Sequence, residues 1–145
     1  MPNTFLAFDY GTKRVGLAVG NDLICSTQPL PAMATRQLFP ADGKTVSDEL
    51  RNLIREWKVD HLVFGAPLDA EGEATQLSKR IRKIGNALGR QLDLPVSFAD
   101  ERYSSGAADR LMREHLPAGK RFSAKKIALR DSVAAELILQ TYFGV

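Results

Sequence analysis

The sequence predicts an α/β fold in which helices pack on the faces of a mixed β-sheet. Two observations favour this class. Near the N-terminus, the apolar segments Phe5–Asp9 and Arg14–Gly20 are joined by a short turn that contains Gly11, a pattern typical of a β-hairpin. Further along, strand-like apolar segments alternate with segments of helical period, and this alternation favours strands covered by helices.

The length and composition favour one folded domain, residues 1–145. The 145 residues include 44% apolar and 26% charged residues, close to the globular average. No apolar run is long enough to cross a bilayer, and the N-terminus lacks a signal-peptide pattern. Cys25 is the only cysteine, which excludes an intrachain disulfide. We therefore expect no membrane association and a reducing compartment, the cytoplasm.

Three strands and one helix are expected in the first half of the chain. After the hairpin, a third strand near Leu23–Thr27 is predicted to end at Pro29 and Pro31, because each proline removes a donor from the ladder. A loop is expected from there to Lys44. Apolar residues at helical spacing then predict an amphipathic helix with Ser47 as its N-cap.

The second half is predicted to alternate between strands and helices. Strands are expected at His61–Gly65 and Val96–Ala99, and helices at Ala74–Leu92, Ala107–Leu116 and Ala124–Tyr142. The predicted order is therefore β-β-β-α-β-α-β-α-α. It describes a five-stranded mixed sheet with helices on its faces.

Basic residues are concentrated in two segments, although the net charge is only +3. Between Arg102 and Arg130, eight Lys or Arg stand against two acidic residues, and the segment Lys79–Arg90 holds five basic residues and no acid. Such clusters are expected in proteins that contact phosphates, although a solvated helix face produces the same pattern.

Three carboxylates occupy positions that require an explanation. Asp9 ends the first strand, Glu101 follows the strand that starts at Val96, and Asp131 lies on the apolar stripe of the last helix. Strand-end acids are often turn formers, and a buried acid often pairs with Arg or Lys. The alternative is a shared divalent cation such as Mg²⁺, which prefers oxygen ligands. Glu101 is favoured over Asp100 because it has the strand parity of Ala99.

A cluster of acids surrounded by arginine and lysine is suited to a polyanionic substrate, which metal ions would link to the carboxylates. In a two-metal arrangement, one ion activates a water and the other stabilises the leaving oxygen of a phosphodiester. Neighbouring cations would hold the adjacent phosphates. The candidate nucleic-acid contacts adjoin the three acids in sequence: Lys13, Arg14, Arg102, Lys125, Lys126 and Arg130.

Four motifs make the chain resemble the YqgF/RuvX family of RNase H-like nucleases, whose members are named pre-16S rRNA nucleases and, earlier, Holliday junction resolvases. The motifs are LAFDYGTKRVGLAVG, GAPLDAEG, DERYSS and DSVAAELILQTYF, in that order from Leu6 to Phe143. The resemblance implies a ribonuclease H-like fold with five strands, the first three antiparallel. It also implies catalytic, metal-binding acids at Asp9, Glu101 and Asp131, with two Mg²⁺ or Mn²⁺ ions.

The resemblance further implies that Gly11 and Gly16 serve a tight turn and close packing. The favoured substrate is the 5′ end of precursor 16S rRNA, in ribosome biogenesis, and branched DNA in recombination and repair is the alternative. A junction resolvase favours a homodimer, but the sequence does not distinguish a dimer from a monomer. Two positions depart from the family pattern: Asp69 replaces the usual asparagine, and Arg130 replaces an aliphatic residue.

Two other function classes fit part of the sequence. The opening Asp-x-Gly-Thr hairpin also resembles the phosphate-binding hairpin of actin-like ATPases and sugar kinases, but those proteins need two such domains and this chain has the length of one. A non-catalytic RNA-binding module, with the acids in structural ion pairs, is the other alternative.

Overall fold

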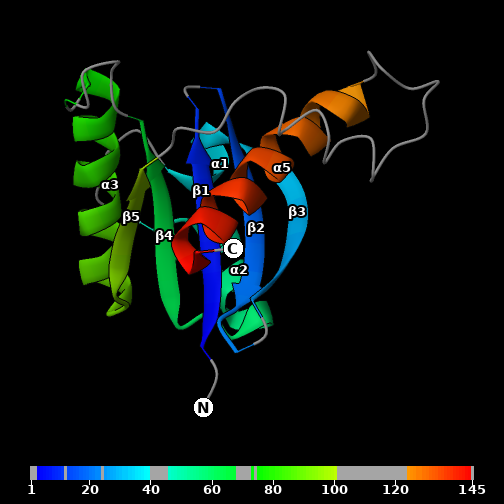
Figure 1. Ribbon diagram of the computed structural model, residues 1–145. Helices are drawn as coiled ribbons and strands as arrows, with labels where there is room; N and C mark the ends of the chain where they lie inside the picture. The colour runs from blue at the N-terminus through cyan, green and yellow to red at the C-terminus, as the bar shows by residue number, and fades with distance from the viewer. Residues whose placement is uncertain are drawn as a thin grey trace.

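The computed structural model describes residues 3–11, 13–23, 25–39, 46–67, 73, 75–100 and 124–144, with backbone alone at residue 100 and residues 124–131. A single five-stranded sheet with the order β3-β2-β1-β4-β5 runs through this part of the chain (Figure 1). Its strands are β1 (Thr4–Tyr10), β2 (Arg14–Asn21), β3 (Ser26–Ala34), β4 (His61–Ala66) and β5 (Val96–Asp100).

The central strand β1 joins an antiparallel half of the sheet to a parallel half. It pairs antiparallel with β2, and β2 pairs antiparallel with β3. On its other side β1 pairs parallel with β4, which pairs parallel with β5. The predicted mixed sheet with three antiparallel strands first is confirmed. The carboxyl ends of β1, β4 and β5 consequently lie at one edge, which we call the carboxyl edge.

Helices cover both faces of the sheet (Figure 1). Three helices, α1 (Thr35–Leu38), α2 (Asp48–Trp57) and α3 (Gln76–Leu92), pack on one face, and α5 (Ala124–Phe143) crosses the other. The expected Ser47 cap is present, because its side chain accepts a hydrogen bond from the Leu50 amide at 3.2 Å.

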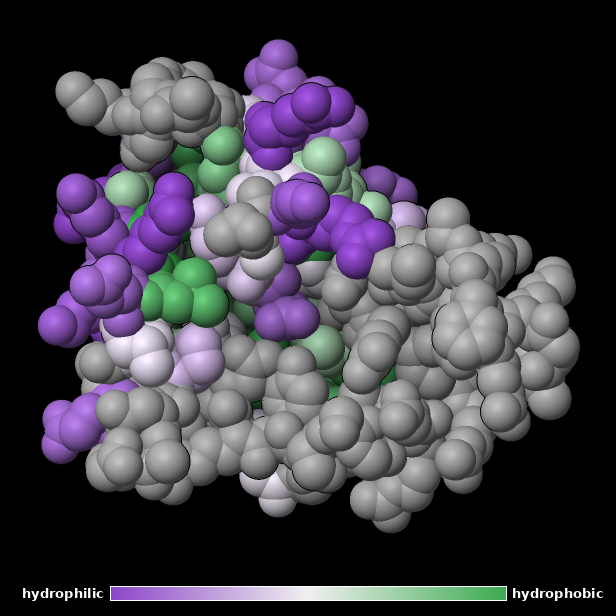
Figure 2. All heavy atoms as spheres, turned by 90° about the horizontal axis from the view of Figure 1, so that it is seen from above, coloured by the Kyte–Doolittle hydropathy of each residue, from purple (hydrophilic) through white to green (hydrophobic). Residues whose placement is uncertain are grey.

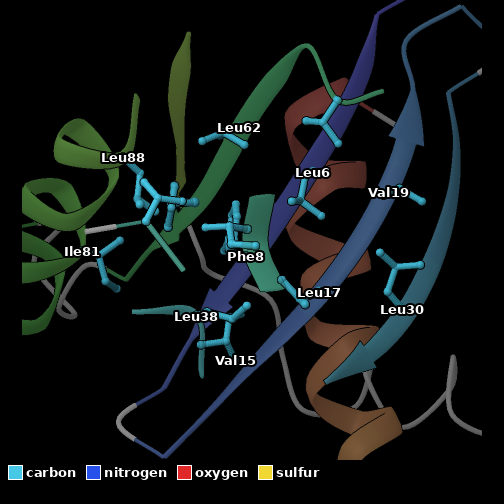
Figure 3. Close-up of a cluster of buried hydrophobic side chains, with 14 residues drawn as sticks. Leu6, Phe8, Val15, Leu17, Val19, Leu30, Leu38, Leu62, Ile81 and Leu88 are labelled. Atoms are coloured by element: carbon cyan, nitrogen blue, oxygen red, sulfur yellow. The ribbon is translucent and has the colours of Figure 1, made fainter. Parts of the chain in front are cut away.

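The larger hydrophobic core lies between the sheet and helices α1, α2 and α3 (Figure 3). Leu6 and Phe8 point into it from β1, and the Phe8 ring stacks on Phe64 of β4 with centroids 4.4 Å apart. Ile81 and Leu88 close it from α3. Alternate residues of β1 therefore face this core, and those between them face α5.

On the opposite face, α5 is held by apolar packing and by hydrogen bonds. Ile138 and Leu139 pack in a cluster with Phe5 and Ala7 of β1. The Leu139 side chain comes so close to β2 that a Cβ at Gly20 would lie 2.6 Å from it. Polar side chains along the same helix form three hydrogen bonds with β3: Ser132 to the Leu30 carbonyl, Thr27 to Glu136 at 2.8 Å, and Gln140 to Thr27 at 3.1 Å.

The prediction for the third strand was wrong. Pro29 and Pro31 lie inside β3 instead of ending it. Because β3 is an edge strand, one side of its backbone has no partner strand, and a missing N–H on that side costs no ladder bond. Part of the expected loop is consequently strand, and part is the short helix α1.

Helix α3 starts two residues later than predicted, at Gln76, after Thr75 caps it by accepting a hydrogen bond from the Ser78 amide. Leu77, in its first turn, is 39% exposed. The predicted helix at 107–116 lies outside the described residues.

A polar cluster joins α5 to the sheet at the end opposite the carboxyl edge. His61 Nε2 and Ser97 Oγ form a hydrogen bond of 2.7 Å, and Ser97 Oγ lies 3.2 Å from the Tyr142 hydroxyl. The His61 ring also packs on Phe5, with centroids 4.7 Å apart. Desolvation lowers the pKa of His61 below its ordinary value of 6.5, because burial disfavours the imidazolium.

We expect this cluster to make stability pH-dependent. The pKa of His61 is lower in the folded protein than in the unfolded chain. Its contribution to the free energy of unfolding is therefore complete above pH 6.5 and is lost as pH falls from 6.5 toward the folded-state pKa. Denaturant unfolding between pH 7 and pH 5 measures the loss. His61→Gln keeps a hydrogen-bonding side chain, and its free energy of unfolding should decrease less between pH 7 and pH 5 than that of the wild type. His115→Gln is the control and should keep the larger decrease. Identical pH dependence of wild type and His61→Gln would contradict the assignment.

Candidate active site

Asp9 stands at the carboxyl edge, next to the last residue of the central strand β1. Its strand parity is that of Phe5 and Ala7, whose side chains pack against α5, so Asp9 lies on the α5 face of the sheet. It is half-buried, and it has an interaction partner in the structure. A carboxylate at this position is a hard oxygen ligand on the partly open rim of the fold.

Both strands that flank β1 carry a buried glycine near the carboxyl edge. Gly16 of β2 is its antiparallel partner. On the other side, the pairing of β1 with β4 ends one residue before Asp9, at Phe8 and Phe64, and the next residue of β4, Gly65, pairs with Ala99 of β5. Gly65 has the parity of Val63, which faces α5. Gly65 therefore adds no side chain to this face of β4 near the carboxyl edge.

Glu101 lies outside the described residues, but the strand that leads to it is described. Ala99 packs in the α5 cluster, and Ser97 approaches Tyr142 of α5. Residues of β5 with the parity of Ser97 and Ala99 therefore face α5. Glu101 was chosen over Asp100 because it has this same parity. β5 itself ends at Asp100, directly before Glu101 in the chain.

Asp131 belongs to α5, and only its backbone is described. The next residue, Ser132, donates a hydrogen bond to the Leu30 carbonyl of β3. Leu30 pairs with Leu17 of β2, and Leu17 pairs with Phe8 of β1. This turn of α5 is therefore level with Phe8, next to Asp9 along the sheet. Four residues that share the helix face of Asp131 at helical spacing are buried: Ala134, Ala135, Ile138 and Leu139.

The structure describes the side chains of two of the six predicted basic contacts. Lys13 and Arg14 are exposed at the β1–β2 hairpin beside Asp9, and Arg14 has an interaction partner. Arg102 and Asp69 lie outside the described residues. The backbone of α5 includes three more predicted contacts, whose side chains are not described: Lys125, Lys126 and Arg130.

The hairpin turn next to Asp9 is fixed by contacts that the sequence did not reveal. A Cβ at Gly11 would lie 2.5 Å from the Arg14 carbonyl oxygen, so a side chain does not fit there. Thr35, the first residue of α1, donates its hydroxyl proton to the Gly11 carbonyl at 2.6 Å, and its amide bonds to the Lys13 carbonyl at 2.9 Å. Thr35 is thus a positioning residue that sequence reasoning missed.

The arrangement of strands and helices defines a class of protein. The structure is similar to Thermus thermophilus RuvC solved in complex with a Holliday junction substrate, with a TM-score of 0.53, 14% identity, and coverage of 97% of this chain and 93% of that one. A second Thermus thermophilus RuvC structure matches with a TM-score of 0.52 and 12% identity over the same shares. The fold is therefore ribonuclease H-like, as predicted.

Within that class, the chain belongs to the RuvX family. The family model, described as "Holliday junction resolvase", matches residues 3–144. Two relatives named "Putative pre-16S rRNA nuclease" are similar over most of both chains. The one from Dechloromonas aromatica is 41% identical over 97% of this chain and 90% of its own length. The one from Paraburkholderia phymatum is 43% identical over 96% and 83%.

Proposed function

We propose that this protein is a divalent-metal-dependent nuclease that hydrolyses phosphodiester bonds in the 5′-end maturation of precursor 16S rRNA. Asp9, Glu101 and Asp131 are its proposed metal ligands, and two Mg²⁺ or Mn²⁺ ions its proposed cofactors. Family membership and the names of the relatives support the nuclease class and the rRNA substrate. We also propose one nuclease domain over residues 1–145 and action in the cytoplasm.

The observation that carries the proposal is the environment of Asp9. Its carboxylate stands on the α5 face, at the carboxyl edge, where Gly16 of β2 is its partner and Gly65 of β4 follows the last residue that pairs with β1. The donor chemistry of a carboxylate fits hard cations, and the glycines add no side chain that would compete for them. A purely structural ion pair would not need glycine on both neighbouring strands.

In the proposed mechanism the metal supplies an activated water and stabilises charge on the leaving 3′ oxygen when bound. Asp9 is held by the ladder between β1 and β2, in which it pairs with Gly16, and α5 is fixed on the same face of the sheet by its apolar packing. Exposed Lys13 and Arg14 at the adjacent hairpin offer cations to the phosphates on either side of the cleaved bond.

We propose that the protein binds nucleic acid, either as a monomer or as a homodimer. No helix in the described part of the chain is long and apolar enough to span a membrane.

Resolution of Holliday junctions is the second candidate. The description of the family model and the junction bound in the similar RuvC structure favour it. Two symmetric cuts in a four-way junction need two active sites, so this function calls for a homodimer.

The first test is Asp9→Asn, which removes the negative charge but keeps the shape. We expect cleavage of precursor 16S rRNA in Mg²⁺ to fall by about 10²-fold or more, because a metal ligand is lost. RNA binding should be retained or strengthened. Ca²⁺ should permit binding and suppress cleavage, since its coordination is larger and looser.

Glu56→Gln provides the matched control, because it removes one acidic charge from an exposed position on α2. Equal cleavage by Asp9→Asn and the control would contradict the role of Asp9.

The second test adds a side chain at Gly65, near Asp9. Gly65→Val places branched bulk on the α5 face of β4, next to Ala99 of β5 and near the carboxyl edge. We expect cleavage to fall by about 100-fold through misplacement of the reacting groups, with the fold retained by circular dichroism. Ala66→Val adds similar bulk to the opposite face of β4, where Ala66 is buried. Equal losses in both variants would show a general packing defect and defeat the interpretation.

The third test separates the two substrates. Purified protein is assayed in Mg²⁺ on precursor 16S rRNA and on a four-way DNA junction, with its mass in solution measured in parallel. We expect cleavage of the rRNA precursor to be faster by at least about tenfold, a difference of about 1.4 kcal/mol in activation free energy. Faster junction cleavage in paired symmetric positions by a dimer would establish the second candidate instead.

A further inference from the structure

The outer face of α3 is a cationic surface that the proposed active site does not use. Helix α3 carries five basic residues and no acid, and all five are exposed: Lys79, Arg80, Arg82, Lys83 and Arg90. Within the described residues, none of the five forms a salt bridge. The acidic residues nearest in sequence, Glu73 and Asp93, stand beyond the two ends of the helix. These charges are therefore available to an external anion.

Three of the cations form a straight row. Lys79, Lys83 and Arg90 are spaced i, i+4 and i+11, which at 100° per residue keeps them within about 40° of one another. The row extends for about 16 Å along the helix. It lies opposite the side that buries Ile81 and Leu88 against the sheet, and therefore faces solvent.

The flank of α3 is tied to the strand that leads to the candidate site. The Arg82 guanidinium lies over the Phe98 ring of β5, 4.9 Å from its centroid, a cation–π contact. A Cβ at Gly85 would be 3.0 Å from the same ring, so the helix and strand are in close contact. The position of the row relative to the end of β5 is consequently fixed.

The row begins at the carboxyl edge. The hydroxyl of Thr75, the N-cap of α3, donates to the carbonyl of Pro67, which follows β4. Lys79 and Lys83 lie in the first turns after that cap, and Arg90 lies toward the other end. Figure 2, which views the molecule from the carboxyl edge, shows hydrophilic side chains gathered along the α3 side. A chain cleaved at this edge thus has a cationic path beside it.

We propose that the row Lys79, Lys83 and Arg90 binds the phosphate backbone of a double-helical RNA segment adjoining the cleaved bond. The inference rests on the proposed nuclease function and adds a second contact surface to it. A rigid row of cations without aromatic side chains suits backbone contact rather than base stacking, since Phe98 is covered by Arg82. A membrane surface is less suitable, because the apolar side of α3 is used against the sheet.

The test compares two triple variants with equal loss of charge. One carries Lys79→Gln, Lys83→Gln and Arg90→Gln on α3. Its control carries Arg51→Gln, Arg55→Gln and Lys58→Gln, which are exposed residues on and just after α2. Binding is measured in Ca²⁺ over a series of salt concentrations. The probes are an RNA with a double-stranded segment beside the cleavage site and the same site with that segment removed.

For the α3 variant on the RNA with the double-stranded segment, we expect the slope of log K against log salt to fall by about 2 to 3, roughly one for each lost contact. The control variant should keep the wild-type slope, and both variants should bind the shortened RNA as the wild type does. An unchanged slope, or equal weakening on both RNAs, would overturn the proposal.

The design also separates this inference from the proposed function. Cleavage of the shortened RNA by the α3 variant should continue at the wild-type rate, because the row is away from Asp9. If the wild type cleaves neither RNA, the nuclease proposal fails, while the salt slopes still report on the α3 surface.

Discussion

The packing of α5 across β1, β2 and β3 is the constraint on which the candidate site depends. Ile138 and Leu139 are almost fully buried there, and each contributes about 1.5–3 kcal/mol by leaving water. Apolar packing alone tolerates small rotations of a helix, whereas the hydrogen bond from Ser132 to the Leu30 carbonyl fixes one orientation. Because one proposed ligand belongs to α5 and another to β1, this contact sets how the two elements meet.

Local patterns predicted most of the fold, and the failures had a non-local cause. Helical period and the Ser47 cap identified α2, and the apolar segments around the Gly11 turn identified the hairpin. The end of the third strand was misjudged because a proline is harmful only where its N–H would meet a partner strand. Whether β3 is central or at the edge depends on strand order, which no local pattern reveals.

The residue types in the sequence suggested the candidate site. They did not predict its geometry. Asp9 was recognised because an acid ends an apolar strand. The approach of Gly65 of β4 to the same edge could not be predicted, since the pairing of β1 with β4 joins distant parts of the chain. The basic residues of α3 were visible as a cluster in the sequence. Their relation to the carboxyl edge needed the contact between Thr75 and Pro67.

The central claim is that the acid at the end of β1 holds a divalent metal together with Glu101 and Asp131. Crystals grown with Mn²⁺, examined by anomalous scattering, test it most directly. We expect a peak on the α5 face of the sheet beside Gly65, with oxygens of the three carboxylates at about 2.1 Å from the ions or bridged by water. Mn²⁺ bound elsewhere, with the Asp9 carboxylate engaged only by protein cations, would contradict the claim.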